Sequence, residues 1–528
     1  MIPRPHAPPL RGLALALGLL LAGSAPHSAS AAVRPPEEGA LAYASAQELQ
    51  AALTAGTLTA TELLTHLKAR IATLNEAGPT LRAVHALNPE ASAAAAASDR
   101  HRRESAPRLL EGLPVLVKDN IETRDPLPTT AGSTALLDNF AKADSPVVAA
   151  LRAQGAIILG KTNLSQWANF RSNDSISGWS AVGGQVRNPH VLDRSPCGSS
   201  SGSGAAVAAG FAPLALGTET NGSIICPAQV NGIVGFKPTH GLLSTAGIVP
   251  LAASQDTAGP MTRTVADAAL MMDAMVPGGT YREALKAGLT GKRVVVAQFA
   301  AGTDPRILAH FEAAQRLLEA AGAELIVLDT FERPLQALGA DSLYVLEAEF
   351  RDGLAAYLAR AQGAFRGKTL ADLIAYNRRE ASRELARFDQ SLFEEAEALG
   401  PRDQTRYEAA RLRLKTAAGT DTLDALLNAH DAQLILAPSG PLTPPVDMVN
   451  GDLWPRWLGL GGEAAVAGYP HLTVPLARID ALPLGLSFIG RAGDDGGVLA
   501  AGAAFETRRG PLPLPAFHPT APVSWGPP

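Results

Sequence analysis

Apolar positions near the start of the chain repeat with helical spacing. They lie mostly three or four positions apart, as on one face of an α-helix, at Leu63, Leu64, Leu67, Ile71 and Leu74. The preceding Thr59-Ala60-Thr61-Glu62 has the form of a capping box, and Ser45-Ala46-Gln47-Glu48 has the same form upstream of Gly56. The pattern therefore predicts two successive helices, the first of which ends near Gly56.

Short apolar runs further along the chain are typical of β-strands. They lie at 113–117, 156–159, 293–297, 324–328, 434–438, 472–475 and 484–489. Between the third and fourth runs, an amphipathic helix is marked by Ile307, Phe311, Ala314 and Leu318. Strands that alternate with helices predict an α/β layered fold.

From about 342 to 418 the chain is almost continuously helical in character and rich in Ala, Leu, Glu and Arg. This segment is either a helical insert that shapes a substrate entrance or an ordinary outer helical layer, and the sequence favours neither. The tail at 510–528 carries many prolines, so we expect it to follow the surface or to be disordered. We find no internal repeat and no clear linker, which favours one domain.

The N-terminal segment 1–31 has the features of a signal peptide. Arg4 and Arg11 supply positive charge, a short apolar core covers 13–22, and Ala29-Ser30-Ala31 offers small residues for cleavage. The core is shorter than the roughly 20 residues that a membrane-spanning helix needs. We therefore expect export, a mature chain that starts near Ala32, a periplasmic or secreted location, and no membrane association after cleavage.

Composition and charge argue against some classes of function. The 528 residues are 46% apolar and 18% charged, with a formal net charge of −5 and no basic stripe, which argues against nucleic-acid binding. The 11 histidines form no metal-binding cluster. Both cysteines, Cys197 and Cys226, flank serine-rich motifs; export permits a disulfide between them, and two separate buried thiols are equally consistent with the sequence.

The candidate chemistry rests on two serines and one lysine. Ser199 lies in the block Cys197-Gly198-Ser199-Ser200-Ser201-Gly202-Ser203, and Ser223 follows Thr218-Glu219-Thr220-Asn221-Gly222. Lys118 comes directly after the apolar run 113–117, at the end of a predicted strand. Glycines allow close approach of a substrate to the backbone. A serine nucleophile with a lysine as the final base is a workable arrangement for acyl transfer.

Two segments also satisfy the sequence patterns of unrelated functional motifs. The segment 155–162 satisfies the P-loop pattern, but its intervening Ala-Ile-Ile-Leu is typical of a strand rather than of an exposed phosphate cradle. The segment 198–202 satisfies the nucleophile-elbow pattern with Ser200 at its centre, but no apolar strand precedes it. We expect neither ATP binding nor an α/β-hydrolase site.

The serine and lysine motifs resemble those of the amidase signature family, whose members are Ser–cisSer–Lys amide hydrolases. The 24-residue separation of Ser199 and Ser223 is also the family's spacing. Further matching segments are 160–165, 256–261 and 467–470. Within the family, the segment 219–227 is most similar to that of secreted bacterial peptide amidases. The resemblance implies a single amidase domain over 32–509, built on a large twisted mixed β-sheet with helices on both faces.

The resemblance also implies roles for individual residues. Ser223 would be the nucleophile, Ser199 would pass its proton on from an unusual cis peptide linkage, and Lys118 would be the base. Backbone N–H groups of Thr220, Asn221, Gly222 and Ser223 would form the oxyanion hole, with Ser200 as support. No cofactor is implied. Lys118 must lose its charge to act, and because Asp119 follows it, the sequence leaves that point open.

The chain departs from the family pattern at Cys197, Ser201 and Asn221, where glycine is commoner; none of these changes removes a catalytic group.

The implied substrate is a short peptide with a C-terminal amide, or a simple aliphatic or aryl amide. Less expected alternatives are a non-catalytic binding protein and a glutamine-hydrolysing amidotransferase subunit. We expect 166–180, with Trp167, Phe170 and Trp179, to line the substrate pocket or to pack in the core. Oligomeric state is left open.

Overall fold

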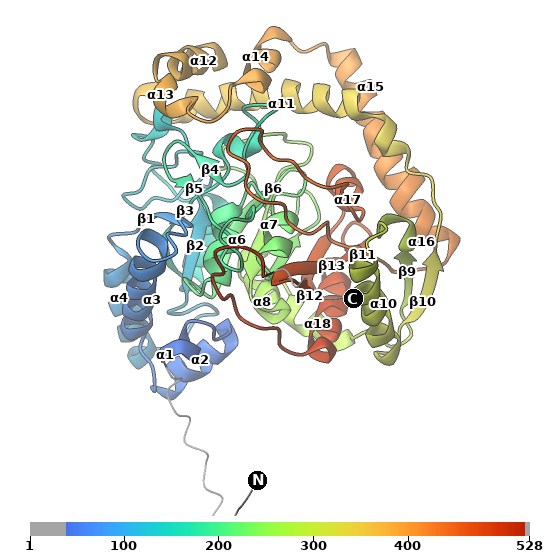
Figure 1. Ribbon diagram of the computed structural model, residues 1–528. Coiled ribbons are helices and arrows are strands. Elements are labelled where there is room, and N and C mark those ends of the chain that lie inside the picture. Colours follow the sequence, from blue (N-terminus) through green and yellow to red (C-terminus); the bar gives the residue numbers. More distant parts are fainter. Residues whose placement is uncertain (1–37, 523–528) are drawn as a thin grey trace, which may run out of the picture. The chain divides into compact units, whose positions relative to one another are not determined.

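An eleven-stranded mixed sheet lies at the centre of the computed structural model, which describes residues 38–522 (Figure 1). The strand order is β1-β3-β2-β6-β8-β7-β12-β13-β11-β9-β10. The strands are β1 (Val84–Leu87), β2 (Pro114–Lys118), β3 (Ile157–Thr162), β6 (Leu214–Glu219), β7 (Val234–Lys237), β8 (Thr257–Thr262), β9 (Arg293–Ala297), β10 (Glu324–Leu328), β11 (Leu434–Pro438), β12 (His471–Ile479) and β13 (Leu482–Gly490). A separate hairpin pairs β4 (Trp179–Ser180) with β5 (Gly184–Gln185). The predicted α/β fold with a large mixed sheet is confirmed.

The sheet is parallel in two places and antiparallel between them. Strands β3, β2 and β6 run parallel, as do β10, β9 and β11, whereas β8, β7, β12 and β13 pair antiparallel with their neighbours. Because β2 and β6 are parallel neighbours, their C-terminal ends lie at the same edge of the sheet. Lys118 ends β2 and Glu219 ends β6, so the lysine motif and the motif that leads to Ser223 meet at this edge.

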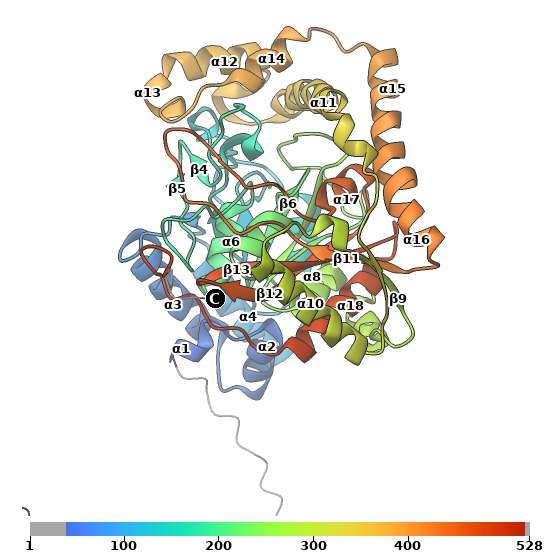
Figure 2. The ribbon, with the colours of Figure 1, turned by 45° about the vertical axis from the view of Figure 1, so that its right-hand side comes forward.

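Helices surround this sheet (Figures 1 and 2). They are α1 (Glu38–Leu41), α2 (Ala46–Ala55), α3 (Ala60–Ile71), α4 (Ala91–Glu104), α5 (Pro146–Ala153), α6 (Ser201–Ala208), α7 (Ile225–Val230), α8 (Val265–Met275), α9 (Tyr281–Ala284), α10 (Pro305–Ala320), α11 (Gly339–Arg360), α12 (Leu370–Arg379), α13 (Ala381–Glu384), α14 (Ser391–Ala398), α15 (Gln404–Lys415), α16 (Ala425–Ala429), α17 (Gly461–Ala467) and α18 (Asp495–Arg509). No helix in the range 38–522 is long and apolar enough to cross a membrane.

The N-terminal helices confirm the predicted capping. Both capping boxes form: the Ser45 hydroxyl accepts a hydrogen bond from the Glu48 N–H at 3.2 Å, and Thr59 accepts one from the Glu62 N–H at 3.1 Å. Helix α2 is followed by Gly56 with φ +69°, a left-handed conformation that glycine adopts without a steric penalty. The predicted apolar face of α3 is buried.

The P-loop-like segment is part of the sheet. Its residues 157–162 form β3, every one of which is buried. The ammonium group of Lys161 donates to the Ile121 carbonyl at 2.5 Å and to the Thr129 hydroxyl at 3.0 Å. This segment is therefore a core strand, as its apolar residues predicted, and not an exposed loop.

The helical segment at 342–418 has an apolar core of its own. In both views α11 to α14 gather at one end of the described unit, and α15 runs beside them (Figures 1 and 2). This core includes Phe350, Leu354 and Phe393 of the helices together with Trp167 and Phe170 from the loop after β3. The helices therefore hold that loop against the rest of the molecule.

The proline-rich tail follows the surface as far as residue 522. Its backbone pairs with the segment 189–192: the Leu192 N–H donates to the His518 carbonyl at 2.8 Å, and the Phe517 N–H donates to the Pro189 carbonyl at 3.0 Å. Arg478 of β12 donates to the Leu514 carbonyl at 3.2 Å. The predicted signal peptide at 1–31 lies outside the described residues.

Candidate active site

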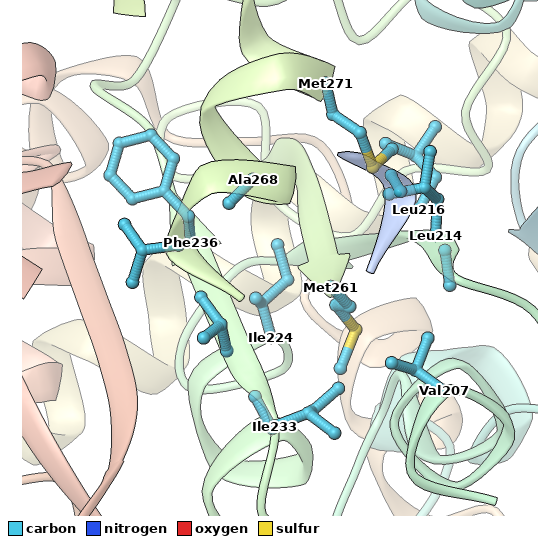
Figure 3. Packing of buried hydrophobic residues seen from close by; sticks show 14 of the residues in the cluster. Val207, Leu214, Leu216, Ile224, Ile233, Phe236, Met261, Ala268 and Met271 are labelled. Carbon is cyan, nitrogen blue, oxygen red and sulfur yellow. The ribbon is translucent and has the colours of Figure 1, made fainter. Parts of the chain in front are cut away.

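The motifs that carry Ser199 and Ser223 sit on the apolar core of the sheet. Figure 3 shows this packing: Leu214 and Leu216 of β6 and Val207 of α6 pack near Met261 of β8 and Ile224, which follows Ser223. Each of these five side chains is fully buried. Because this core is apolar and closely packed, the polar loop that it supports has little freedom to move.

Lys118 lies fully buried within hydrogen-bond distance of three oxygen atoms. Its Nζ is 2.7 Å from the Ser199 Oγ, 2.8 Å from the Thr218 Oγ1 and 3.3 Å from the Thr218 carbonyl oxygen. The side-chain amide of Asn120 also donates to the Thr218 Oγ1, at 3.0 Å. The ends of β2 and β6 therefore bring Lys118 and Thr218 together, and the Ser199 hydroxyl, from the loop before α6, meets Lys118 there.

The environment of Lys118 favours its neutral form. Burial lowers the pKa of Lys118 to about 7, although the carboxylates of Asp256 and Glu219 oppose the shift. Asp119 faces elsewhere: its carboxylate accepts hydrogen bonds from the backbone N–H and the hydroxyl of Thr130, and it lies 3.0 Å from the His85 Nε2. The question that Asp119 raised at the sequence level is thus answered by the direction of its side chain.

A neutral lysine has two N–H groups and one lone pair. Thr218 can accept both N–H groups, one at its hydroxyl and one at its carbonyl oxygen. The lone pair is then directed to the Ser199 Oγ, where it can accept the hydroxyl proton. This arrangement can take a proton from a serine at neutral pH.

The predicted cis linkage is present between Gly198 and Ser199. The Ser199 carbonyl accepts from the Ser165 N–H at 3.1 Å, and the Ser200 N–H donates to the Ser223 carbonyl at 3.1 Å. The structure thus places the backbone of Ser223 beside the Ser199-Ser200 pair. The Ser200 hydroxyl bonds the N–H and the carbonyl of Thr218, at 3.2 and 3.0 Å, so it ties the two motifs together.

The turn before Ser223 exposes backbone donors. Gly222 has φ +82°, and among the described residues the N–H groups of Asn221, Gly222 and Ser223 have no hydrogen-bond acceptor. The Glu219 carboxylate holds the end of this turn, because it accepts from the N–H groups of Ile224 and Ile225, at 2.8 and 3.0 Å. Free N–H groups next to a serine can stabilise an oxyanion.

Asp256 supports the same turn from the other side. Its carboxylate accepts from the Thr220 hydroxyl at 2.5 Å and from the N–H groups of Leu251 and Ala252, at 2.9 and 3.0 Å. Burial raises the pKa of Asp256 to about 6, while these hydrogen bonds act in the opposite direction. Asp256 therefore links the turn to the loop before β8.

Cys197 and Cys226 form a disulfide, with their Cα atoms 5.9 Å apart. The bridge joins the residue before Gly198 to the first turn of α7, which follows Ser223. It packs with Val230 and against Trp454. The question left open by the sequence is thus decided in favour of a covalent link between the two serine loops.

A cavity of about 360 Å³ opens beside the two serine loops. Gly198, Asn221 and Gly222 contribute to its wall, so the cavity reaches the backbone on both sides of the site. The remaining lining residues are Asn169, Ser177, Cys197, Ile225, Cys226, Ser439, Asp452, Trp454, Trp457, Gly461 and Gly462. None of the lining residues comes from the helical segment 342–418.

Comparisons with known proteins identify the family and support the fold. The family model described as "Amidase" matches residues 62–499. The chain belongs to the amidase family. It is 34% identical to a probable amidase of Arabidopsis thaliana, over 88% of this chain and 89% of that one, and 32% identical to a glutamyl-tRNA(Gln) amidotransferase subunit of Latilactobacillus sakei, over 87% and 95%. The solved structure of native peptide amidase from Stenotrophomonas maltophilia is 42% identical, with a TM-score of 0.84 and coverage of 90% and 98%.

The structure of this amidase decides between the two alternatives for the segment 166–180. Trp167, Phe170 and Trp179 pack edge-on or tilted against Phe393, Phe350 and Phe388, which is the core-packing alternative. Only the polar Asn169 and Ser177 of the expected segment 166–180 line the cavity. The aromatic wall is formed instead by Trp454 and Trp457, from a loop that carries no recognisable motif.

Thr218 received no role from the sequence, although it stands in the motif that leads to Ser223. Its one available signal was its position, two residues before the turn 220–223. No group of side chains suited to a metal ion occurs within the described part of the amidase.

Proposed function

We propose that this amidase hydrolyses the C-terminal amide of short peptides through an acyl-enzyme on Ser223, with release of ammonia. The observation that carries the mechanism is the buried contact of 2.7 Å between the Lys118 Nζ and the Ser199 Oγ, next to a turn with free N–H groups. Free serine is a weak nucleophile, so a base must take its proton during attack.

In the first half of the reaction, the Ser223 Oγ attacks the carbonyl carbon of the amide. Its proton passes to the Ser199 Oγ while the proton of Ser199 passes to the lone pair of Lys118. The negative charge on the carbonyl oxygen is stabilised by the backbone N–H groups of the turn 220–223. One such donor is typically worth about 3 kcal/mol in the transition state.

Collapse of this intermediate breaks the carbon–nitrogen bond. Ser199 gives its proton to the leaving nitrogen, Lys118 restores the proton of Ser199, and ammonia departs. Water then attacks the ester on Ser223 by the same proton route in reverse and releases the peptide acid. Lys118 begins and ends the cycle neutral, which its lowered pKa of about 7 supports.

A similar solved structure and the size of the cavity both support a peptide substrate. The solved structure with 42% identity over 90% of this chain is a peptide amidase. The cavity of about 360 Å³ falls within the usual range of small-molecule sites, roughly 300–1,000 Å³. It meets the serine loops at glycine backbone, which lets an extended acyl group approach closely.

The test is ammonia release by the purified mature protein, with Ser223→Ala alongside. The panel holds C-terminally amidated dipeptides, simple aliphatic and aromatic amides, and glutamine. Ammonia from peptide amides without cleavage of the internal peptide bond is the expected result. Release of ammonia from simple amides alone would agree with the proposed mechanism but would contradict the proposed specificity for peptides.

A glutamine-hydrolysing subunit is the second candidate, favoured by the 32% identity to the amidotransferase subunit of Latilactobacillus sakei. Such a protein would release ammonia from glutamine in preference to peptide amides. Inertness towards every amide, with a folded protein, would instead favour a non-catalytic binding role.

We further propose that the protein is exported by the segment 1–31 and acts in the periplasm or outside the cell. The support is the arrangement of charged, apolar and small residues in that segment. Mass measurement of the protein from a periplasmic fraction tests this: a chain starting near Ala32 is expected, and a full-length chain retained in the cytoplasm would contradict it.

A further inference from the structure

One wall of the cavity comes from a long loop. The chain between β11 and α17, residues 439–460, forms no helix or regular strand, yet it contributes Ser439, Asp452, Trp454 and Trp457 to the lining. The two serine loops contribute Gly198, Asn221 and Gly222 to the same cavity. An acyl chain that extends from Ser223 into this cavity would therefore meet groups of the loop.

Asp452 is anchored in this wall as an acceptor. Its two carboxylate oxygens lie 3.1 and 3.0 Å from the Ser177 N–H. Burial raises the pKa of Asp452, and hydrogen bonds from Ser177 and Trp454 act in the opposite direction. These donors leave part of the acceptor capacity of the carboxylate unused, since two oxygens offer about four lone-pair sites.

The charge of Asp452 has no partner among the described residues. It is the only charged side chain that lines the cavity, and no lysine or arginine of the described chain pairs with it. An uncompensated carboxylate in a partly buried site costs free energy that a bound cation would recover. An anionic group in the same cavity would be repelled.

Two indole rings complete the wall. Trp454 and Trp457 have ring centroids 5.4 Å apart at an interplanar angle of 66°, and both line the cavity. Trp454 packs on the disulfide between Cys197 and Cys226, which fixes its position relative to the serine loops. Indole faces attract cations more strongly than other aromatic rings, and a neighbouring carboxylate adds to that attraction.

We propose that this wall is a cation subsite: Asp452, Trp454 and Trp457 bind a positively charged group on the acyl part of the amide substrate. The inference rests on the proposed function and narrows its substrate class to amides with a cationic nitrogen. That nitrogen comes from a lysine- or arginine-like side chain or from the free α-ammonium group of a short peptide. Primary amides lose only ammonia, so the cation belongs to the part that becomes the acyl-enzyme.

The test compares matched dipeptide amides that differ in one group. The N-acetylated set ends in lysine amide, norleucine amide or glutamate amide, and a second norleucine amide carries a free α-ammonium group. For the wild-type protein, kcat/KM for a cationic member is expected to exceed that for its neutral match by about 10- to 100-fold. Preference for acetylated lysine amide identifies a side-chain cation; preference for the non-acetylated norleucine amide identifies the α-ammonium group.

The variant Asp452→Asn removes the charge and keeps the shape. The ratio of kcat/KM for the preferred cationic substrate over its neutral match is expected to fall to within about threefold of unity. The control is Asp447→Asn in the same loop. This partly buried carboxylate accepts hydrogen bonds from Val449 and Asn450 and does not line the cavity, so its ratio stays at the wild-type value.

Binding provides a readout that does not require turnover. In the Ser223→Ala protein, the cationic peptide amide is expected to bind at least about tenfold more tightly than its neutral match by calorimetry. Equal affinity, or equal kcat/KM for all members in the wild-type protein, overturns the subsite. Absence of ammonia from every peptide amide overturns the proposed function instead, and the calorimetric comparison still decides the subsite.

Discussion

The two walls of the cavity are built in different ways. The serine wall is made of short motifs at strand and helix ends, joined by a disulfide and by backbone hydrogen bonds such as the one from Ser200 to Ser223. The loop wall at 439–460 lacks helices and regular strands, and Asp452 anchors it by hydrogen bonds to one N–H of the neighbouring loop. Ser199 and Ser200 are fully buried, whereas 39% of the Trp457 surface is exposed.

This difference separates chemistry from recognition. Proton transfer requires distances held within a few tenths of an ångström, and buried motifs on a sheet edge supply that rigidity. Recognition of an acyl group tolerates more variation, and loops accept sequence change because few other parts of the structure depend on them. Changes on the serine wall should therefore affect every substrate alike, while changes on the loop wall should affect substrates selectively.

Ser223→Ala is the largest expected effect on the serine wall. Loss of the proposed nucleophile should lower kcat by about 10⁴-fold or more for every amide in the panel. Removing a single oxygen leaves the fold intact, which circular dichroism and the thermal midpoint can check. Burst release of product in this variant would show that another residue is the nucleophile.

Lys118→Met should be nearly as damaging, at about 10³-fold or more in kcat, because the Ser199 Oγ then has no base. The matched control is Lys161→Met, which removes another fully buried lysine that lies on β3 and bonds no serine of the site. A folded Lys161→Met protein should keep the wild-type pH dependence. Turnover by Lys118→Met near the wild-type rate would show that Lys118 is not the base.

The acidic side of the pH–rate profile should report Lys118. In the proposed mechanism neutral lysine is the active form, so kcat/KM should rise as pH increases through about 7 and should fall about tenfold per pH unit well below it. The Asp256 carboxylate raises the pKa of Lys118, so Asp256→Asn should move this limb to lower pH. A limb that stays in place in Asp256→Asn would mean that another group controls it.

Thr218→Val tests the supporting contacts of the serine wall. It removes the hydroxyl that receives an N–H of Lys118 at 2.8 Å while the carbonyl contact remains. We expect kcat to fall about 10- to 100-fold with little change in KM, because the lone pair of Lys118 is then poorly directed. A rise in KM with unchanged kcat would place Thr218 in substrate binding instead.

Loss of the disulfide should have the smallest effect on the chemistry and a clear effect on stability. Cys197→Ser with Cys226→Ser opens a link across 29 positions and should lower the free energy of unfolding by about 3 kcal/mol. Reductant should lower the thermal midpoint of the wild-type protein but not that of the double variant. Because Trp454 packs on this bridge, the preference for cationic substrates should weaken more than turnover of neutral ones.

The sequence could predict elements with strong local signals. Ser45 and Thr59 cap their helices as expected, since a capping box is decided by residues three positions apart. Strand β8 was missed because its Gly259 and Pro260 are poor strand formers, and the closeness of neighbouring backbone overrides that preference. A Cβ at Gly259 would lie 2.1 Å from the Phe236 carbonyl oxygen, so close packing across the sheet demands glycine there.

The sequence by itself determined the family and which residues form the serine and lysine motifs, because catalysis restricts both residue type and spacing. Only the tertiary structure decided that Asp119 turns away from Lys118, that Thr218 receives the lysine's N–H groups, and that Trp454 rather than Trp167 lines the cavity. These features depend on the direction of side chains between segments far apart in the chain. Such directions follow from packing and burial, which no local pattern of residues encodes.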